Sequence, residues 1–110
     1  MSELQITAEQ TPSGFIVRLN GDADGEQVDE LDRQLRLIAN LNPKLLVLDL
    51  TRLNFLSSVG MGLLVRIQNQ LKENGGRLAL AAARPLVREA LRRASLQKVF
   101  QITETVEEVK

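Results

Sequence analysis

Cysteine, histidine, tryptophan and tyrosine are all absent from this chain of 110 residues. Without cysteine the chain can form no disulfide, no thiolate nucleophile and no zinc–thiolate site. Without histidine it lacks the commonest general base and metal ligand. Three phenylalanines are its only aromatic residues, which leaves little for the stacking that binds single-stranded nucleic acid. These absences predict a protein that is not an enzyme and that holds no metal or cofactor.

An excess of charge is also missing, since 14 Lys and Arg balance 14 Asp and Glu. A chain without net charge has no overall field to attract nucleic acid or an anionic membrane. No apolar stretch approaches the about 18 residues of a membrane helix. The first residues lack the basic start and apolar run of a signal peptide. We therefore expect a cytoplasmic protein with no direct nucleic-acid partner and no membrane partner.

Strand patterns recur along the chain. Two short strands flank a turn at Pro12-Ser13-Gly14, which predicts an antiparallel hairpin. Two later apolar runs are nearly continuous, which is typical of strands buried on both faces of a parallel sheet. The predicted strands are residues 3–8, 15–19, 45–48 and 78–81, and residues 99–102 are expected to form a short final strand or a turn.

Three segments between these strands carry apolar residues at helical spacing. Asp24 precedes the first and, with Gln27, has the pattern of a capping box. Gly75-Gly76 provides a left-handed stop after the second, and Pro85 suits the first position of the third. The predicted helices are residues 24–40, residues 58–74 and a third that begins at residue 85.

The resulting order is ββαβαβα, followed by a last short helix within residues 103–109. Strands that alternate with helices imply parallel crossover connections. We therefore expect one α/β domain over residues 1–110, with a mixed, mostly parallel sheet of four to five strands. Residues 51–57 are expected to form a loop between the third strand and the second helix.

The most informative segment is residues 53–64, where this loop meets the helix. Ser57 and Ser58 stand together at the junction. A serine here can be a helix N-cap. It can also be a modification site, because a phosphoryl group adds about −1.5 to −2 charges and a helix N-terminus accommodates an anion. The added charge would weaken the binding of a partner that covered Ser58. Phosphorylation of this serine could therefore switch partner binding off.

The Gly60-Met61-Gly62 sequence has an alternative interpretation as the start of a dinucleotide-binding fingerprint. Val65 stands at the third small position of that pattern, and the chain contains no P-loop sequence. The two glycines are better explained by close packing at the start of the helix. A small nucleotide-binding enzyme therefore stays an alternative with little support.

Charged clusters have functional and structural interpretations. The arginines of the third helix could form a docking patch, but scattered charges on a polar helix face are the norm. An acidic cluster near the first helix lacks calcium-loop spacing, and an acidic helix start explains it better. Asp49 has no His, Cys or Lys near it in sequence to complete a catalytic group. The clusters are Arg77, Arg84, Arg88, Arg92 and Arg93, and Asp22, Asp24, Glu26, Asp29 and Glu30.

Motifs over about residues 4–102 resemble bacterial anti-sigma factor antagonists of the STAS-domain family. Residues 45–50 are similar to the family's buried strand that ends in Asp. Phe55-Leu56 matches its apolar pair, and Gly60-Met61-Gly62 matches its Gly-Leu-Gly sequence. Residues 19–24 look like its Gly-Glu-Leu-Asp turn, with Asp24 on the acidic position. Residues 74–80 are similar to the Gly-Gly sequence that precedes a strand in this family. Its C-terminal pattern of apolar residues is matched by Leu86, Leu91, Leu96, Val99 and Phe100.

The resemblance implies a partner switch. Ser58 falls on the serine that a partner kinase phosphorylates in this family, and Ser57 is the alternative hydroxyl. The unmodified protein would bind an anti-sigma factor that is also a serine kinase, and so free a sigma factor. A metal-dependent serine phosphatase would restore binding. The implied partner-binding residues are Asp24, Ser57, Ser58, Val59, Gly60, Met61 and Gly62.

Three departures from the family pattern accompany this resemblance. Ser57 replaces the usual acid, Val59 stands where a small or hydroxyl residue is common, and Ser95 replaces a glycine in a turn. An alternative function is a STAS subunit without a switch, which supports a lipid-transport ATPase or a signalling scaffold. That alternative predicts a complex that is insensitive to charge at Ser58.

Overall fold

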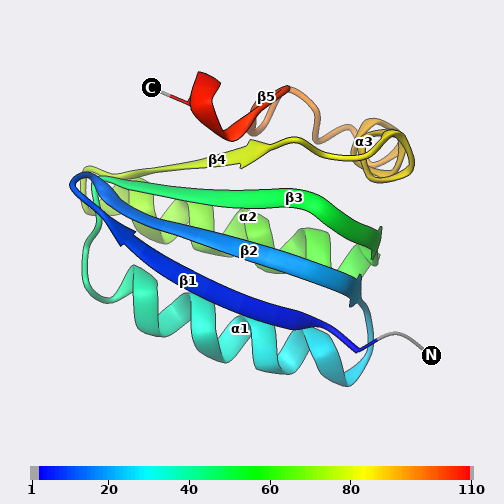
Figure 1. Ribbon diagram of the computed structural model, residues 1–110, viewed down its shortest axis with the longest axis horizontal. Helices are drawn as coiled ribbons and strands as arrows, with labels where there is room; N and C mark the ends of the chain where they lie inside the picture. Colours follow the sequence, from blue (N-terminus) through cyan, green and yellow to red (C-terminus); the bar gives the residue numbers. More distant parts are fainter. Residues whose placement is uncertain (1–2, 110) are drawn as a thin grey trace.

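The computed structural model describes residues 3–109, and within them one sheet has the strand order β1-β2-β3-β4-β5 (Figure 1). β1 pairs with β2 antiparallel, as the predicted hairpin requires, and the remaining pairs are parallel. The mixed, mostly parallel sheet is therefore confirmed. Its strands are β1 (Gln5–Thr11), β2 (Gly14–Ala23), β3 (Leu45–Leu56), β4 (Arg77–Ala81) and β5 (Gln101–Thr103).

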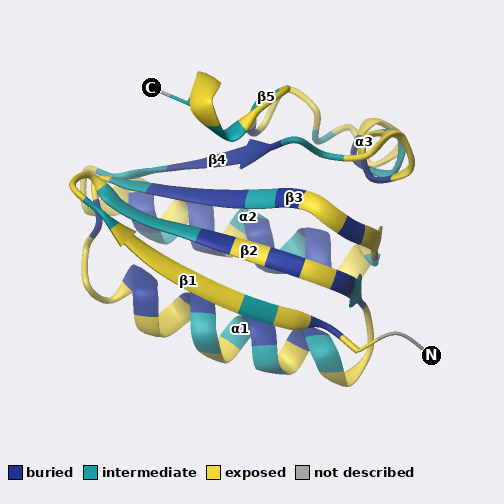
Figure 2. Cartoon of the chain, viewed as in Figure 1, coloured by how far each residue is buried: buried dark blue, intermediate teal, exposed yellow. Residues whose placement is uncertain are grey.

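Helices α1 (Glu26–Ala39) and α2 (Ser58–Glu73) cover one face of the sheet. Helix α3 (Pro85–Arg93) lies beside the C-terminal end of β3, and a single 3-10 turn, η1 (Val106–Glu108), follows β5. The core between sheet and helices is largely leucine, and its buried residues are dark blue in Figure 2. Its largest buried side chains are Leu19, Leu31, Leu35, Leu46, Leu48, Leu50, Leu53, Leu63, Leu64, Ile67, Leu71 and Leu78.

The predicted signals at two helix ends are confirmed. Gly75 has φ of 81°, and the Gly76 amide donates to the Leu71 carbonyl at 2.8 Å, which closes α2 with a left-handed stop. Pro85 occupies the first turn of α3. Ser95 has φ of 60° in the turn after α3, the left-handed region that glycine adopts most readily.

The loop predicted over residues 51–57 is wrong, because β3 continues to Leu56. Its last residues pair with an equally extended β2, in which Gly21 lies opposite Leu53 and Ala23 opposite Leu56. The register shifts near Asn20 and Asp22, so the alternation of buried and exposed residues is broken. Because the alternation is broken, a search for a period-two pattern does not identify these residues as a strand.

The N-cap predicted at Asp24 is also wrong. Gly25 is the N-cap of α1, with φ of 54° and no side-chain cap. The Asp24 carboxylate instead accepts a hydrogen bond from the Gly25 amide at 2.9 Å. Gln27 does not complete a capping box, because its Oε1 accepts from the Leu4 amide at 3.2 Å and ties the start of β1 to α1.

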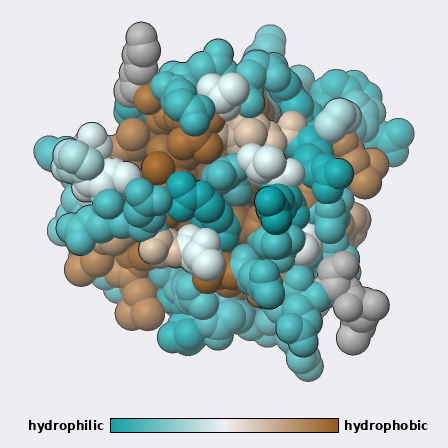
Figure 3. Space-filling model, viewed as in Figure 1, coloured by the Kyte–Doolittle hydropathy of each residue, from teal (hydrophilic) through white to brown (hydrophobic). Residues whose placement is uncertain are grey.

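The face of the sheet opposite α1 and α2 is the one seen in Figure 3, where polar side chains separate smaller apolar patches. A shallow hollow of about 390 Å³ on this face is lined by β1, β2 and β3. Arg18 lies there, 2.9 Å from Glu9 and 3.6 Å from Asp49. Arg18 is therefore flanked by a carboxylate on each of the two neighbouring strands.

Candidate functional site at the start of helix α2

The junction of β3 and α2 is held in place by backbone bonds from two sides. The Ser57 amide donates to the Ala23 carbonyl at 3.0 Å, which joins the end of β2 to the start of α2. The Met61 amide donates to the Ser57 carbonyl at 2.9 Å and begins the helix. The segments that follow the carboxyl ends of β2 and β3 therefore lie next to each other, because the two neighbouring strands are parallel.

Ser57, not Ser58, is the N-cap. Its backbone is extended (φ −74°, ψ 166°), and its Oγ accepts a hydrogen bond from the Gly60 amide at 3.1 Å. Ser58 is the first helical residue and is exposed. Within residues 3–109, the side-chain hydrogen bond of this turn involves Ser57 and leaves the Ser58 hydroxyl free. The two serines predicted together thus have different environments.

The first turns of α1 and α2 differ in their content of acidic residues. The first turn of α1 carries Glu26 and Asp29, whereas the first turn of α2 carries no acidic residue. Unpaired amides and the helix dipole favour negative charge at a helix start. An anion attached to Ser58 would therefore meet no carboxylate from the first turn of its own helix.

The other residues predicted to bind a partner are not equally accessible. Asp24 and Val59 are exposed, and Gly62 is half-buried. Gly60 and Met61 are buried, so both position the turn from within. The predicted set therefore divides into an exposed group around Ser58 and a buried support beneath it.

Close packing explains one of the two glycines. A Cβ on Gly60 would lie 2.9 Å from the Leu56 Cδ1 and 3.4 Å from the Ala23 carbonyl oxygen. A Cβ on Gly62 would meet only the Arg66 guanidinium, at 3.7 Å. The interpretation of close packing is confirmed for Gly60 and wrong for Gly62.

Three apolar side chains on the segments around this junction are exposed, and the sequence pattern carries no signal for their exposure. Val59 is 67% exposed, Phe55 44% and Leu86 67%. Phe55 and Leu86 line a groove of about 250 Å³ between the end of β3 and α3, with Leu56, Val87 and Ala90. Helical spacing places Leu86 on the apolar face of the third helix, but that face buries Val87 and Leu91 and leaves Leu86 outside.

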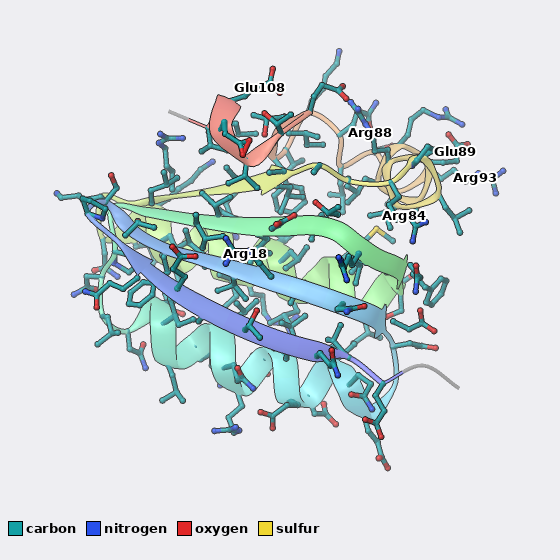
Figure 4. All side chains as sticks on the ribbon, in the orientation of Figure 1. Arg18, Arg84, Arg88, Glu89, Arg93 and Glu108 are labelled. Carbon is teal, nitrogen blue, oxygen red and sulfur yellow. The ribbon has the colours of Figure 1, made fainter. Side chains whose placement is uncertain are left out.

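The rim of this groove is charged but internally paired (Figure 4). Glu89 accepts from Arg92 at 2.6 Å and from Arg93 at 3.1 Å. Hydrogen bonds from Arg92 and then Arg93 lower the pKa of Glu89 from 4.5 to about 2. Arg88 pairs with Glu104 at 2.7 Å. The arginines of α3 thus form a solvated, paired face, as the structural interpretation expects.

Two further searches concern metals and membranes. Between residues 3 and 109, no three acidic side chains come close enough to one another to hold a metal ion. In the same part of the chain, no helix has the length and apolar character needed to cross a bilayer.

A family model of the STAS domain matches residues 5–109. The chain therefore belongs to the STAS domain family, which confirms the resemblance drawn from the sequence at the level of family and fold. The fold places the Ser57–Ser58 turn at the carboxyl ends of β2 and β3.

Relatives and solved structures agree with this assignment. The anti-sigma F factor antagonist of Paenibacillus polymyxa is 30% identical over 100 residues, which are 90% of this chain and 86% of that protein. An anti-sigma factor antagonist from Mycobacterium paratuberculosis has a TM-score of 0.88 at 24% identity, covering 96% of this chain and 90% of that one. SpoIIAA of Bacillus, phosphorylated, has a TM-score of 0.74 at 23% identity, covering 94% and 95%. Unphosphorylated SpoIIAA has a TM-score of 0.82 at 23% identity, covering 94% and 91%.

Proposed function

We propose that this STAS domain is an anti-sigma factor antagonist whose binding is switched off by phosphorylation of Ser58. The observation that carries the proposal is a free, exposed serine hydroxyl at a helix start without acidic residues in its first turn. The names of relatives as anti-sigma factor antagonists, and the existence of a phosphorylated SpoIIAA, support it.

The physical basis of the switch is the cost of charge in a packed interface. A phosphoryl group adds about −1.5 to −2 charges, and unpaired charge enclosed between two proteins is strongly unfavourable. The free domain tolerates the same group, because Ser58 is exposed and the helix start favours an anion. Phosphorylation would therefore break the complex and leave the fold intact.

The partner surface is centred on Ser58 and Val59 and extends to Asp24, Phe55 and Leu86. Ser57, Gly60, Met61 and Gly62 shape this surface from below or at its margin. Val59, the residue that follows Ser58 in the chain, and Leu86 expose large apolar area, and such side chains contribute most where a partner excludes water from them. We expect Val59→Ala and Leu86→Ala to weaken partner binding without loss of folding.

The proposed partner is an anti-sigma factor with serine kinase activity. That kinase transfers the γ-phosphoryl group of ATP to the Ser58 Oγ, whose proton is lost, and ADP leaves. ATP and Mg²⁺ belong to the kinase, and this chain is its substrate and not an enzyme. A metal-dependent serine phosphatase hydrolyses the phosphoserine and restores binding. Sigma-factor-dependent transcription in the cytoplasm is the process controlled.

The test is capture of partners from the source cell lysate with wild type, Ser58→Asp, Ser58→Glu and Ser58→Ala. Ser13→Asp is the matched control, because Ser13 is exposed in the hairpin turn far along the sheet. Wild type, Ser58→Ala and Ser13→Asp should capture an anti-sigma kinase, and the acidic variants at Ser58 should lose it. Equal capture by all variants would favour the STAS subunit without a switch.

The identity of the modified serine is tested with the captured kinase and ATP. Ser57 Oγ is engaged by the Gly60 amide, so phosphorylation there would replace the helix cap. We expect mass spectrometry to locate phosphate on Ser58. Ser58→Ala should abolish incorporation while Ser57→Ala should retain it, and the reverse pattern would assign the switch to Ser57.

A further inference from the structure

Arg66, in α2, is the one helical arginine without a partner among residues 3–109. It is exposed and forms neither a salt bridge nor a side-chain hydrogen bond in that part of the chain. A guanidinium offers a planar fork of N–H donors that suits carboxylate and phosphate groups. The arginines of α1 and α3 all form salt bridges, namely Arg33, Arg36, Arg88, Arg92 and Arg93.

The carboxylate that neighbours Arg66 on α1 is already occupied. Asp32, Arg36 and Arg66 line one hollow of about 260 Å³ between α1 and α2. The Asp32 carboxylate accepts from the Arg36 guanidinium at 2.7 and 2.6 Å. These hydrogen bonds, followed by the charges of Arg36 and Arg66, lower the pKa of Asp32. Arg66 thus feels this carboxylate at a distance, and its own donors stay available for another anion.

The Arg66 side chain extends over Gly62 towards the start of α2. A Cβ on Gly62 would lie 3.7 Å from the Arg66 Nη1, which places the guanidinium beside the preceding helical turn. Long side chains of a helix point towards its N-terminus, and Gly62 has no side chain to stand in the way. The guanidinium therefore lies about 6 Å closer to the start of the helix than its own backbone does.

Ser58 lies on the same face of α2 as Gly62 and Arg66. At about 100° per residue, Gly62 and Arg66 lie about 40° and about 80° around the helix from Ser58. Ser58 and Arg66 are exposed, and Gly62 between them is half-buried. Residues four apart on a helix have Cβ atoms about 5–6 Å apart, so a group that extends beyond the Ser58 Oγ can reach the guanidinium over Gly62.

We propose that Arg66 binds the phosphoryl group of phosphorylated Ser58, across the gap that Gly62 leaves open. This inference rests on the proposed function, because it concerns the phosphorylated form of the same site. The phosphoryl group supplies three acceptor oxygens, and each N–H of the guanidinium can donate to one of them at about 2.7–2.9 Å. The contact holds the phosphate on the surface that the partner would cover. It also gives Gly62 a role that close packing does not.

The test uses the full chain with phosphoserine inserted at residue 58 during translation, so that no kinase is needed. Phosphorus NMR over a pH series measures the second pKa of the phosphate, which is about 6 for phosphoserine. A bound guanidinium favours the dianion, so this pKa should be about 0.5–1 lower with Arg66 than in Arg66→Gln.

Arg52→Gln is the matched control. Arg52 is also exposed and lacks a salt bridge within residues 3–109, but it lines the hollow on the opposite face of the sheet. Its replacement should leave the phosphate pKa unchanged. Asp24, which follows β2 beside the Ser57 turn, acts on the phosphate equally in every variant, so the comparison isolates the arginine.

Two substitutions at Gly62 separate a direct contact from the mere presence of a nearby charge. Gly62→Leu keeps Arg66 but fills the gap, so it should raise the phosphate pKa as Arg66→Gln does. Gly62→Ala leaves ordinary contact with the guanidinium and should keep the pKa low. Melting temperatures of the unphosphorylated variants show that each one is folded.

An unchanged phosphate pKa in Arg66→Gln, or an equal change in Arg52→Gln, overturns the proposal. A low pKa retained in folded Gly62→Leu overturns the path across Gly62. If Arg66→Gln leaves the pKa unchanged and instead weakens partner capture, Arg66 serves the partner and the proposal is wrong. These results do not depend on a kinase, so a contact with Arg66 in a protein whose capture ignores charge at Ser58 would refute the proposed switch and not the contact.

Discussion

Replacing Ser57 by alanine should destabilise the protein, whereas replacing Ser58 should not. The Ser57 Oγ accepts the Gly60 amide at 3.1 Å, and loss of such a cap costs about 0.5–2 kcal/mol. The Ser58 side chain is exposed, and substitutions at such positions stay within about 0.5 kcal/mol. For a chain of this length, about 1 kcal/mol corresponds to a fall in melting temperature of about 4–5 °C.

The assay is urea and thermal unfolding of wild type, Ser57→Ala, Ser58→Ala and Ser57→Asp. Aspartate caps a helix about as well as serine and complements the positive helix start, so Ser57→Asp should match or slightly exceed wild type. Equal losses in Ser57→Ala and Ser58→Ala would refute the assignment of the cap to Ser57. A loss in Ser57→Asp as large as that in Ser57→Ala would refute the capping argument itself.

Four further substitutions probe the helices, one turn and one ion pair. Gly62→Ala should raise the free energy of unfolding by about 0.5–1 kcal/mol. Gly60→Ala should lower it, because a Cβ at Gly60, unlike one at Gly62, would crowd its neighbours. Urea titrations of the two variants compare these free energies. Ser95→Gly should stabilise by about 0.5–1 kcal/mol, since Ser95 has φ of 60°, and a lower melting temperature would contradict this. The pKa of Glu89 is lowered to about 2, so its ion pair stabilises the fold above pH 4.5 and is lost as pH falls from about 4.5 to about 2. Carboxyl NMR should show that pKa rising in Arg92→Gln, and an unchanged pKa would contradict the pairing.

Most of the fold could be predicted because its elements carry local signals. The continuous apolar run at 45–48, the helical spacing of α2, the Gly75-Gly76 stop and Pro85 each correspond to a strand, helix or boundary in the structure. Such signals depend on burial and backbone freedom, which a residue expresses through its own type and spacing.

The errors fall where a distant partner decides the local outcome. The end of β3 is a strand because β2 continues beside it, and that pairing leaves a shifted register with no period-two pattern. Gln27 bonds to Leu4 instead of completing a capping box. Helical spacing groups Leu86 with the buried face of its helix, yet β3 stops at Leu56 and leaves Leu86 exposed beside Phe55.

Residue type and spacing alone were enough to establish the class of fold, the order of its elements and the position of the serine pair at the start of α2. These conclusions follow from apolar periodicity and turn residues. Three outcomes required the folded chain: which serine caps the helix, which glycine is crowded, and which apolar side chains stay exposed. They depend on contacts between segments far apart in the chain, because the same residue can be buried or exposed according to where its neighbours end.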